Sequence, residues 1–405
     1  MQKILFSYLR FWAKGYLART KPEIIAITGS VGKTSTKEAV FSVLREKFGR
    51  DVRKSEGNLN NESGVPVAIL GFKHAPSYEA KNPLGWILIM LAAPFKSFFL
   101  KKVKILVLEY AADKPGDIKY LTDLAKPKIA VLTSIGPSHL ENFNSLTNII
   151  EEKADLLRAL NIDKESWAIL NLDDDNVKKI AYAGRFQKKT YGIDTNADFR
   201  ATDITTEISG FKALSKFKIS FENKKILIRQ NILGGVGNIN AALAAAAIGR
   251  IYDLTDTEIK AGLEKVKSEK HRLNIVKGKN GSIIIDDAYN ASPSSVKAAL
   301  NILNKLSCQP GSLAGGKKIV VLGDMRELGK VSTESHKDIG QYAKEHSDDQ
   351  VAIGNLAKNY NFKNYFKNPS KAEDYLLNNI SEGDIILIKA SRAIGLEKLV
   401  ESLKE

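Results

Sequence analysis

The stretch Ile24-Ile25-Ala26-Ile27-Thr28-Gly29-Ser30-Val31-Gly32-Lys33-Thr34-Ser35 decides the fold of this chain. An apolar, β-branched run leads into two glycines, a lysine and hydroxyl residues, and a helical pattern follows from Lys37 to Phe48. A strand, a glycine turn and a helix in this order are typical of a phosphate-binding loop. The backbone amides and the positive end of the helix dipole then face an anion.

Each residue type in the loop suits a bound nucleotide. Gly29 and Gly32 let the backbone turn tightly and approach a phosphate closely. Lys33 is placed to reach the terminal phosphates, and Thr34 offers its hydroxyl to Mg²⁺. The spacing departs from the standard eight-residue loop, because Ile27 stands where the first glycine belongs. An ordinary strand-to-helix turn is the alternative, and the Gly-Lys-Thr sequence directly before a helix favours nucleotide binding.

The composition is that of a globular protein with about two or three domains. The 405 residues carry 61 Lys and Arg against 46 Asp and Glu, a formal charge of +15. This excess suits nucleic acid, anionic lipid or phosphorylated substrates. No nucleic-acid motif accompanies it, so we expect no nucleic-acid partner. The one cysteine, Cys308, cannot form an internal disulfide, which predicts a structural thiol in a reducing, cytoplasmic environment.

Two segments combine apolar and basic residues. Residues 1–20 predict a basic amphipathic helix, with no cleavage site of a secretory signal. The run Leu84 to Leu100 is slightly short for a membrane-spanning helix, and Pro94 and Lys96 interrupt it. A buried helix pair and a shallow membrane-surface contact both explain this run, and the basic N-terminal segment favours peripheral membrane association through 1–20 and 84–100.

Polar residues follow several predicted strands. Val103 to Leu108 is a buried-strand pattern ending in Glu109, and a second, 128–134, precedes His139. Ligands gather at the carboxyl ends of strands in open α/β sheets, so these residues and the phosphate loop predict one site. Either residue alone would be an ordinary loop residue.

The rest of the chain predicts a second α/β unit. A helix over 148–160 carries Lys153, residues 190–230 are β-rich, and Gly234 to Asn238 opens an alanine-rich helix. From about Glu269, strands alternate again with helices, which predicts a second parallel sheet. We therefore predict an N-terminal segment at 1–22, a central phosphate-loop-type parallel-sheet ATPase domain at 23–268, and a C-terminal Rossmann-like α/β domain at 269–405.

Seven motifs in order resemble the Mur ligases, most closely their D-alanyl-D-alanine-adding members. They are TGSVGKTS, GNLNNESGVP, VLEYAADKPGDI, SIGPSHLENF, DDAYNASPSS, VLGDMRELG and KASR, and the match covers roughly 24–405. The resemblance implies ATP-dependent amide formation with Mg²⁺. A UDP-N-acetylmuramoyl tripeptide is first phosphorylated on its carboxylate, and D-alanyl-D-alanine then displaces the phosphate. We expect a monomer that acts on these small molecules.

The resemblance also implies roles for individual residues. Those implied to bind ATP are Gly29, Ser30, Val31, Gly32, Lys33, Thr34, Ser35, Asn61, Asn238, Arg272, Asp287 and Asn290. Those implied to act in catalysis are Lys33, Glu109, His139 and Lys153, of which the last stands where several Mur ligases carry a carbamylated lysine. Thr34, Glu109 and His139 are implied to hold metal, and Lys389, Ser391 and Arg392 to bind the second substrate. The competing interpretations are a surface salt bridge for Lys153, turn capping for Asn61 and a helix start for Ser391.

The chain departs from the family pattern in three places. Gly237 stands where a histidine usually precedes Asn238, and Ala241 takes a second asparagine position. KASR replaces the commoner KGSR. Only about twenty residues precede the first strand, where family members usually carry a domain that grips the uridine nucleotide. The alternatives are therefore a Mur-type ligase for another acid (a lipid-linked muramoyl peptide, folate or an amino-acid polymer), or a non-catalytic ATP-binding partner.

Overall fold

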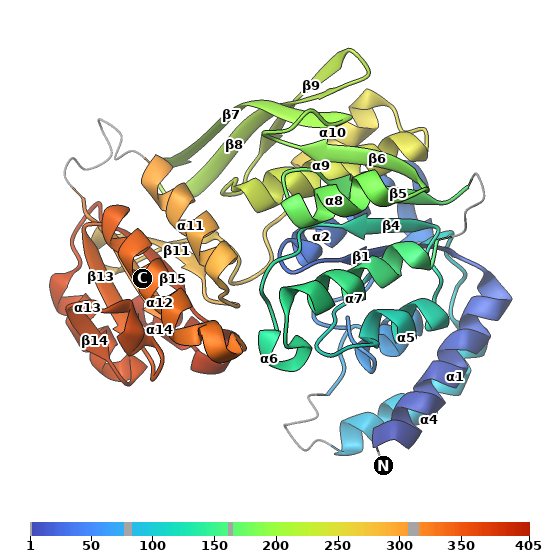
Figure 1. Ribbon diagram of the computed structural model, residues 1–405, viewed down its shortest axis with the longest axis horizontal. Coiled ribbons are helices and arrows are strands. Elements are labelled where there is room, and N and C mark those ends of the chain that lie inside the picture. The colour runs from blue at the N-terminus through green and yellow to red at the C-terminus, as the bar shows by residue number, and fades with distance from the viewer. Residues whose placement is uncertain (1, 77–82, 161–164, 307–315) are drawn as a thin grey trace.

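A computed structural model describes residues 2–76, 83–160, 165–306 and 316–405 of the chain. Two α/β units lie side by side, the first built up to about residue 268 and the second after it (Figure 1). Cys308, for which we predict a structural thiol, lies outside the described residues.

The first unit is organised by a nine-stranded sheet of order β2-β3-β1-β4-β5-β6-β7-β8-β9. Neighbours from β2 to β7 are parallel, and β7-β8 and β8-β9 are antiparallel. The strands are β1 (Glu23–Thr28), β2 (Val52–Lys54), β3 (Ile105–Glu109), β4 (Ile129–Leu132), β5 (Trp167–Asn171), β6 (Gln187–Gly192), β7 (Phe199–Ser209), β8 (Lys212–Phe221) and β9 (Lys224–Gln230).

Helices cover both faces of this sheet, which explains why its central strands are apolar throughout. In β1, Ile24 and Ala26 pack into one core, and Ile25 and Ile27 into the core on the other face. The first core is completed by α1 (Gln2–Thr20), α3 (Gly64–Ile69), α4 (Pro83–Phe99), α5 (Asp117–Leu124), α6 (Leu140–Phe143), α7 (Leu146–Arg158) and α8 (Asp175–Ala183). The second is completed by α2 (Lys33–Phe48), α9 (Val236–Ile251) and α10 (Asp256–Glu264).

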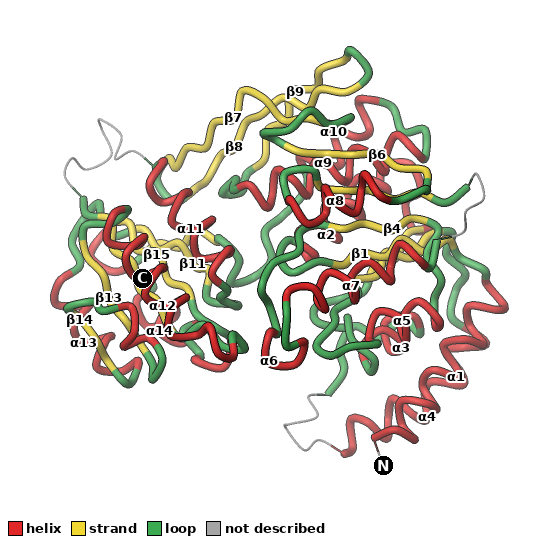
Figure 2. Tube along the Cα trace, viewed as in Figure 1, coloured by secondary structure: helices red, strands yellow, loops and turns green. Residues whose placement is uncertain are grey.

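The second unit repeats the plan on a smaller scale. Its six-stranded sheet has the order β10-β11-β15-β12-β13-β14, and only the β10-β11 pair is antiparallel. The strands are β10 (Asn274–Lys277), β11 (Ile283–Asp287), β12 (Lys318–Gly323), β13 (Asp349–Ile353), β14 (Asn364–Phe366) and β15 (Ile385–Lys389). One face packs on α11 (Pro293–Lys305) and α12 (Ser332–Glu345), and the other on α13 (Pro369–Asn379) and α14 (Glu397–Leu403). Figure 2 shows strands between helices in both units.

The prediction that Pro94 interrupts the apolar run is wrong, because α4 continues through it from Pro83 to Phe99. Proline removes the amide that would bond the carbonyl four residues earlier, that of Met90. The hydroxyl of Tyr8 in α1 donates to that carbonyl at 3.2 Å, so the freed oxygen is satisfied. The run is thus one helix packed on α1 and not a buried pair of helices. None of the described helices is long and apolar enough to span a membrane.

Candidate active site

The phosphate loop joins the end of β1 to α2, which begins at Lys33, four residues before the predicted helix start. Gly32 has a φ of 89°, a left-handed conformation that favours glycine. A Cβ on Gly29 would lie 1.9 Å from the Thr133 hydroxyl, so only glycine fits against the end of β4. That hydroxyl donates to the Val31 carbonyl at 2.7 Å and ties the loop to the neighbouring strand. The loop is therefore held in place before any anion binds.

Lys33 lies at the start of α2, beneath the loop. Its ammonium group donates to the Gly29 carbonyl at 2.8 Å. Desolvation lowers its pKa from the usual value, and nearby Arg272 acts in the same direction, while Glu109 opposes it. A cation held this way sits close to the position that a terminal phosphate takes above the loop.

Glu109 ends β3 directly beside the loop and is 2% exposed. Burial acts to raise its pKa, but the cations of Lys37 and Lys33 and a hydrogen bond from Asn60 together hold the pKa below its usual value. Asn60 donates to Oε1 at 2.9 Å, and the Lys37 ammonium lies 3.6 Å from Oε2. No described residue donates a hydrogen bond to Oε2. A buried, ionised oxygen without a donor is suited to a cation.

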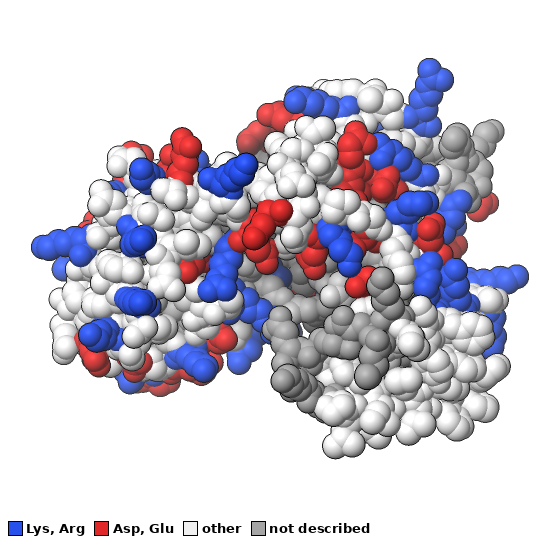
Figure 3. Space-filling model, turned by 60° about the horizontal axis from the view of Figure 1, so that its bottom comes forward, with Lys and Arg blue, Asp and Glu red and all other residues white. Residues whose placement is uncertain are grey.

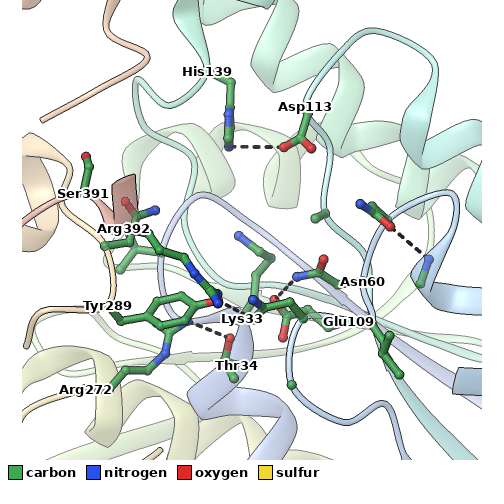
Figure 4. A pocket seen from close by; sticks show the side chains of 18 of the residues that line it. Lys33, Thr34, Asn60, Glu109, Asp113, His139, Arg272, Tyr289, Ser391 and Arg392 are labelled. Atoms are coloured by element: carbon green, nitrogen blue, oxygen red, sulfur yellow. Dashed lines mark hydrogen bonds and ion pairs between the residues drawn. The ribbon is translucent and has the colours of Figure 1, made fainter. Parts of the chain in front are cut away.

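The site is a cavity of about 1150 Å³ that both units line. From the second unit, Arg272 donates to the Thr34 hydroxyl at 3.2 Å, and its guanidinium lies 4.1 Å from the Tyr289 ring centre. Arg392 donates to the Tyr289 hydroxyl at 3.3 Å, and that hydroxyl bonds Asn58 of the first unit. Figure 4 shows these side chains converging around Lys33 and Glu109. The second unit therefore supplies two of the cations that surround the phosphate loop, Arg272 and Arg392.

His139 lies on the other side of the cavity from Glu109 (Figure 4). Its Nδ1 is 2.7 Å from a carboxylate oxygen of Glu327 in the second unit, and its Nε2 is 3.6 Å from Asp113. The imidazole thus bridges the two units through carboxylates on either side.

The remaining predicted residues of the second unit form one network at the ends of β11 and β15. The Lys389 ammonium lies 2.6 Å from Asp287 and donates to the Asn290 carbonyl at 2.9 Å. The Ser391 hydroxyl accepts from the Arg326 amide at 2.9 Å. All five residues line the cavity, and Lys389 and Asp287 neutralise each other in this conformation.

Two predicted residues, Asn61 and Asn238, are placed less directly. Asn61 lines the cavity, but its side-chain oxygen accepts from the Ser63 and Gly64 amides, which is the capping role named as the alternative. Asn238 lines a smaller pocket beside Ser35 and Arg272 and donates to the Leu233 carbonyl.

Lys153 is 3% exposed on α7, so the surface salt bridge proposed as its alternative does not occur. Desolvation is the largest influence on this side chain and Lys33 adds to it, which lowers its pKa to about 7. A lysine with this pKa is partly a neutral amine at neutral pH.

The sequence reasoning missed four residues that the fold brings to the site: Lys37, Asn60, Tyr289 and Glu327. Asn60 and Tyr289 lie inside motifs that were already recognised, next to predicted residues. Lys37 lies one helical turn after Lys33, and that spacing places both ammonium groups on one face of α2.

The residues present fit Mg²⁺. Among the described residues no group of three or more His, Cys, Asp or Glu side chains could hold a metal ion. Mg²⁺ does not require one, because it takes one or two protein oxygens and fills its shell with phosphate oxygens and waters. Glu109 Oε2 and the Thr34 hydroxyl are such oxygens at the phosphate loop.

Comparisons with known proteins agree with this geometry. Residues 27–249 match the Mur ligase middle domain, and residues 271–392 match the Mur ligase glutamate ligase domain. The chain is 32% identical over 404 residues to a UDP-N-acetylmuramoyl-tripeptide–D-alanyl-D-alanine ligase of Bacillus subtilis, covering 97% of this chain and 78% of that one. The chain belongs to the Mur ligase family. A Buchnera aphidicola ligase of the same name is 34% identical over 393 residues, covering 95% of this Mur ligase and 76% of the relative.

The fold of this Mur ligase is also similar to that of solved MurF enzymes. The MurF ligase of Thermotoga maritima in complex with ADP has a TM-score of 0.81 and 26% identity, covering 98% of this chain and 83% of that one. The predicted family and the predicted pair of α/β units are confirmed.

Proposed function

We propose that this Mur ligase uses ATP to join D-alanyl-D-alanine to a UDP-N-acetylmuramoyl tripeptide in the cytoplasm. The observation that carries the proposal is the ionised Glu109 carboxylate, with one oxygen free of donors, beside a phosphate loop and three cations (Lys33, Lys37, Arg272). The names of the relatives supply the substrates. A single cysteine in 405 residues agrees with a reducing compartment.

The reaction is a phosphoryl transfer followed by an acyl transfer. A carboxylate oxygen of the acid attacks the γ-phosphorus of ATP, the bond from that phosphorus to the bridging oxygen breaks, and ADP leaves. The amine of D-alanyl-D-alanine then attacks the acyl carbon, phosphate leaves, and the amine gives up its proton. Neither step needs a protein nucleophile, so the protein acts by positioning and by charge neutralisation.

The positions of the side chains suggest a separate role for each of them in these two steps. Gly29–Ser35 are proposed to hold the phosphates, mainly through the amides at the start of α2, because the Ser30 and Val31 amides donate to Ser134. Lys33 counters charge on the terminal groups, and Arg272 adds a cation from the second unit. Thr34 and Glu109 would hold Mg²⁺, which neutralises phosphate charge when bound, and His139 would hold a second metal.

Lys153 is proposed to be carbamylated: its neutral amine, which a pKa of about 7 provides, would add to CO₂ and release a proton to solvent. The product would be an anion in place of a buried cation, and its oxygens would be suited to hold metal. On the nucleotide, Asn61, Asn238, Asp287 and Asn290 are proposed to contact the phosphates, ribose and adenine.

Lys389, Ser391 and Arg392 are proposed to bind D-alanyl-D-alanine. All three line the cavity on the second unit, opposite the phosphate loop. Arg392 suits the carboxylate of the incoming dipeptide, while Lys389 is paired with Asp287 in this conformation. We propose a monomer as the active form.

The test is phosphate release with ATP, Mg²⁺, D-alanyl-D-alanine and UDP-N-acetylmuramoyl tripeptide, omitting each component in turn. We expect release only when all four are present, and loss of release in Lys33→Ala. Lys47→Ala, an exposed lysine on the same helix, is the matched control and should behave like the wild type. No release with the full mixture from a protein that binds ATP would refute the acid assignment and favour a lipid-linked or unrelated acid.

A further inference from the structure

Helices α1 and α4 form a parallel pair at the edge of the first unit, away from the second unit (Figure 1). Beyond the Tyr8–Met90 contact, the Tyr16 hydroxyl donates to the Lys101 carbonyl at 3.1 Å, and Arg19 donates to the Ser97 carbonyl at 3.0 Å. Their inner faces are buried at four-residue spacing, for example by Leu9 and Ala13 of α1. The pair is therefore a fixed part of the fold with a defined outer side.

That outer side is apolar, and we call it the apolar face. Along α4 the exposed apolar residues recur at alternating spacings of four and three positions, so they form one stripe on the outer side of the helix. The stripe and its neighbour on α1 are 60% to 72% exposed: Phe11, Leu84, Leu88, Leu91, Phe95 and Phe98. Figure 3 shows a broad uncharged surface where the pair lies. Contiguous apolar surface of this kind marks an interaction site.

The two helices that carry the apolar face have charged residues of one sign only. Neither residues 1–22 nor residues 83–108 contain an aspartate or glutamate. Because the helices are parallel, Arg19, Lys101 and Lys102 gather at the same end of the pair, and all three are exposed. Lys14 is exposed one turn earlier on α1.

This charge pattern decides between occupants. A second copy of the chain would offer no acidic partner for the basic end in either helix. An anionic lipid surface pairs with the basic end, while its acyl region takes the leucines and phenylalanines. We propose that the apolar face docks this protein in the plane of an anionic lipid bilayer.

Docking on this face also orients the cavity. Trp86 lies on the inner side of α4, 8% exposed, and lines the cavity together with His74. One helix therefore separates the bilayer from the mouth of the cavity. The proposal goes beyond the ligase activity and does not depend on which acid the enzyme uses.

The test is flotation of the purified protein with vesicles of phosphatidylcholine, with or without about 30% phosphatidylglycerol, at about 0.1 M salt. We expect binding to the anionic vesicles only, weakening as salt rises. The double variant Leu88→Asp with Leu91→Asp should bind at least about tenfold more weakly, since two leucines no longer enter the acyl region. The matched control is Tyr182→Asp on α8, which changes a 70% exposed aromatic residue elsewhere.

A second pair of variants tests the charge. Lys101→Glu with Lys102→Glu should weaken binding by about fivefold or more for each lysine. Lys224→Glu with Lys225→Glu, two exposed neighbours on β9, changes the net charge equally and should leave binding intact. Melting curves and ATP binding should match the wild type in all four variants.

Three results would overturn the proposal: no vesicle binding by the wild type, equal loss in the control variants, or binding that ignores lipid charge. A dimer that forms without lipid and is abolished by the Leu88 and Leu91 substitutions, with no vesicle binding, would assign the apolar face to a second copy. Full ligase activity in solution would leave the proposal standing, because docking and turnover are measured separately.

Discussion

The buried pair of Lys37 and Glu109 should behave as one energetic unit. Lys37 is fully buried, and its ammonium lies 3.6 Å from Glu109 and 3.9 Å from Glu269. At an effective dielectric constant of about 20, two unit charges at that shorter distance attract by about 4–5 kcal/mol. Removing one partner of a buried ion pair costs about 3–5 kcal/mol, and the lower end applies here because Lys33 still faces Glu109 and Glu269 still faces Lys37.

We therefore expect Lys37→Met and Glu109→Gln each to lower the free energy of unfolding by about 3 kcal/mol. The double variant should lose less than the sum of the two, with a coupling of about 2 kcal/mol. Urea unfolding followed by tryptophan fluorescence measures the stability of the first α/β unit, which contains this pair. The three tryptophans, Trp12, Trp86 and Trp167, all precede residue 268.

The exposed pair of Lys265 and Glu46 is the matched control. Its charges lie closer, at 2.7 Å, but the lysine side chain is 64% exposed. A cycle of Lys265→Met and Glu46→Gln should therefore give a coupling below about 1 kcal/mol. Additive effects at Lys37 and Glu109 within about 0.5 kcal/mol would refute the claim that burial makes this pair strong.

The same pair predicts a pH dependence. The pKa of Glu109 in the folded protein lies below its usual value. Its stabilising contribution is therefore present above the unfolded-state pKa and is lost as pH falls through the folded-state pKa. The stability advantage of the wild type over Glu109→Gln should shrink in acid, measured by urea unfolding across that range.

Three further predictions concern single side chains. Lys33→Ala should lower phosphate release at least about 100-fold with an unchanged melting curve, and near-normal release would remove this lysine from the phosphate site. For Lys153, the folded pKa of about 7 lies below the unfolded value, so the unfolded chain binds the extra proton above pH 7, and wild-type stability should rise from neutral to alkaline pH relative to Lys153→Met. In CO₂-free buffer, where the amine is not carbamylated, a flat difference between the two proteins would show that Lys153 is not desolvated. Arg272→Ala should lower kcat/KM for ATP by about 10- to 100-fold, and an unchanged value would make its contact with Thr34 incidental.

The sequence was sufficient for the strands and for the position of the phosphate loop. Alternating burial on both faces of β1 follows from its unbroken apolar run, and the predicted buried strand that ends in Glu109 is β3, Ile105–Glu109. These features depend on local pattern. The continuation of α4 through Pro94 does not depend on local pattern. It depends on the hydroxyl of Tyr8 in α1, which bonds the Met90 carbonyl although the two residues are 82 positions apart in the sequence.

The same distinction applies to the site. Motifs located the cavity, but they could not tell Asn60 from Asn61, since only the turn of the chain decides which amide faces Glu109. The burial of Lys153 was also outside the reach of the sequence. A lysine on a helical pattern is usually solvated, and only packing of α7 against the sheet removes this one from water.

Helix α4 borders the cavity on one side and carries the apolar face on the other. Trp86 touches the cavity, and the opposite side of the same helix carries the apolar face. Two ligands that both shift one rigid helix are linked, and the linkage free energy is equal in the two directions. A substrate that contacts Trp86 and shifts α4 would change the affinity of the enzyme for a bilayer by some factor. The bilayer would then change the affinity of the enzyme for that substrate by the same factor. Where that factor favours binding, the time that the enzyme spends at the surface would rise with the supply of its own substrate.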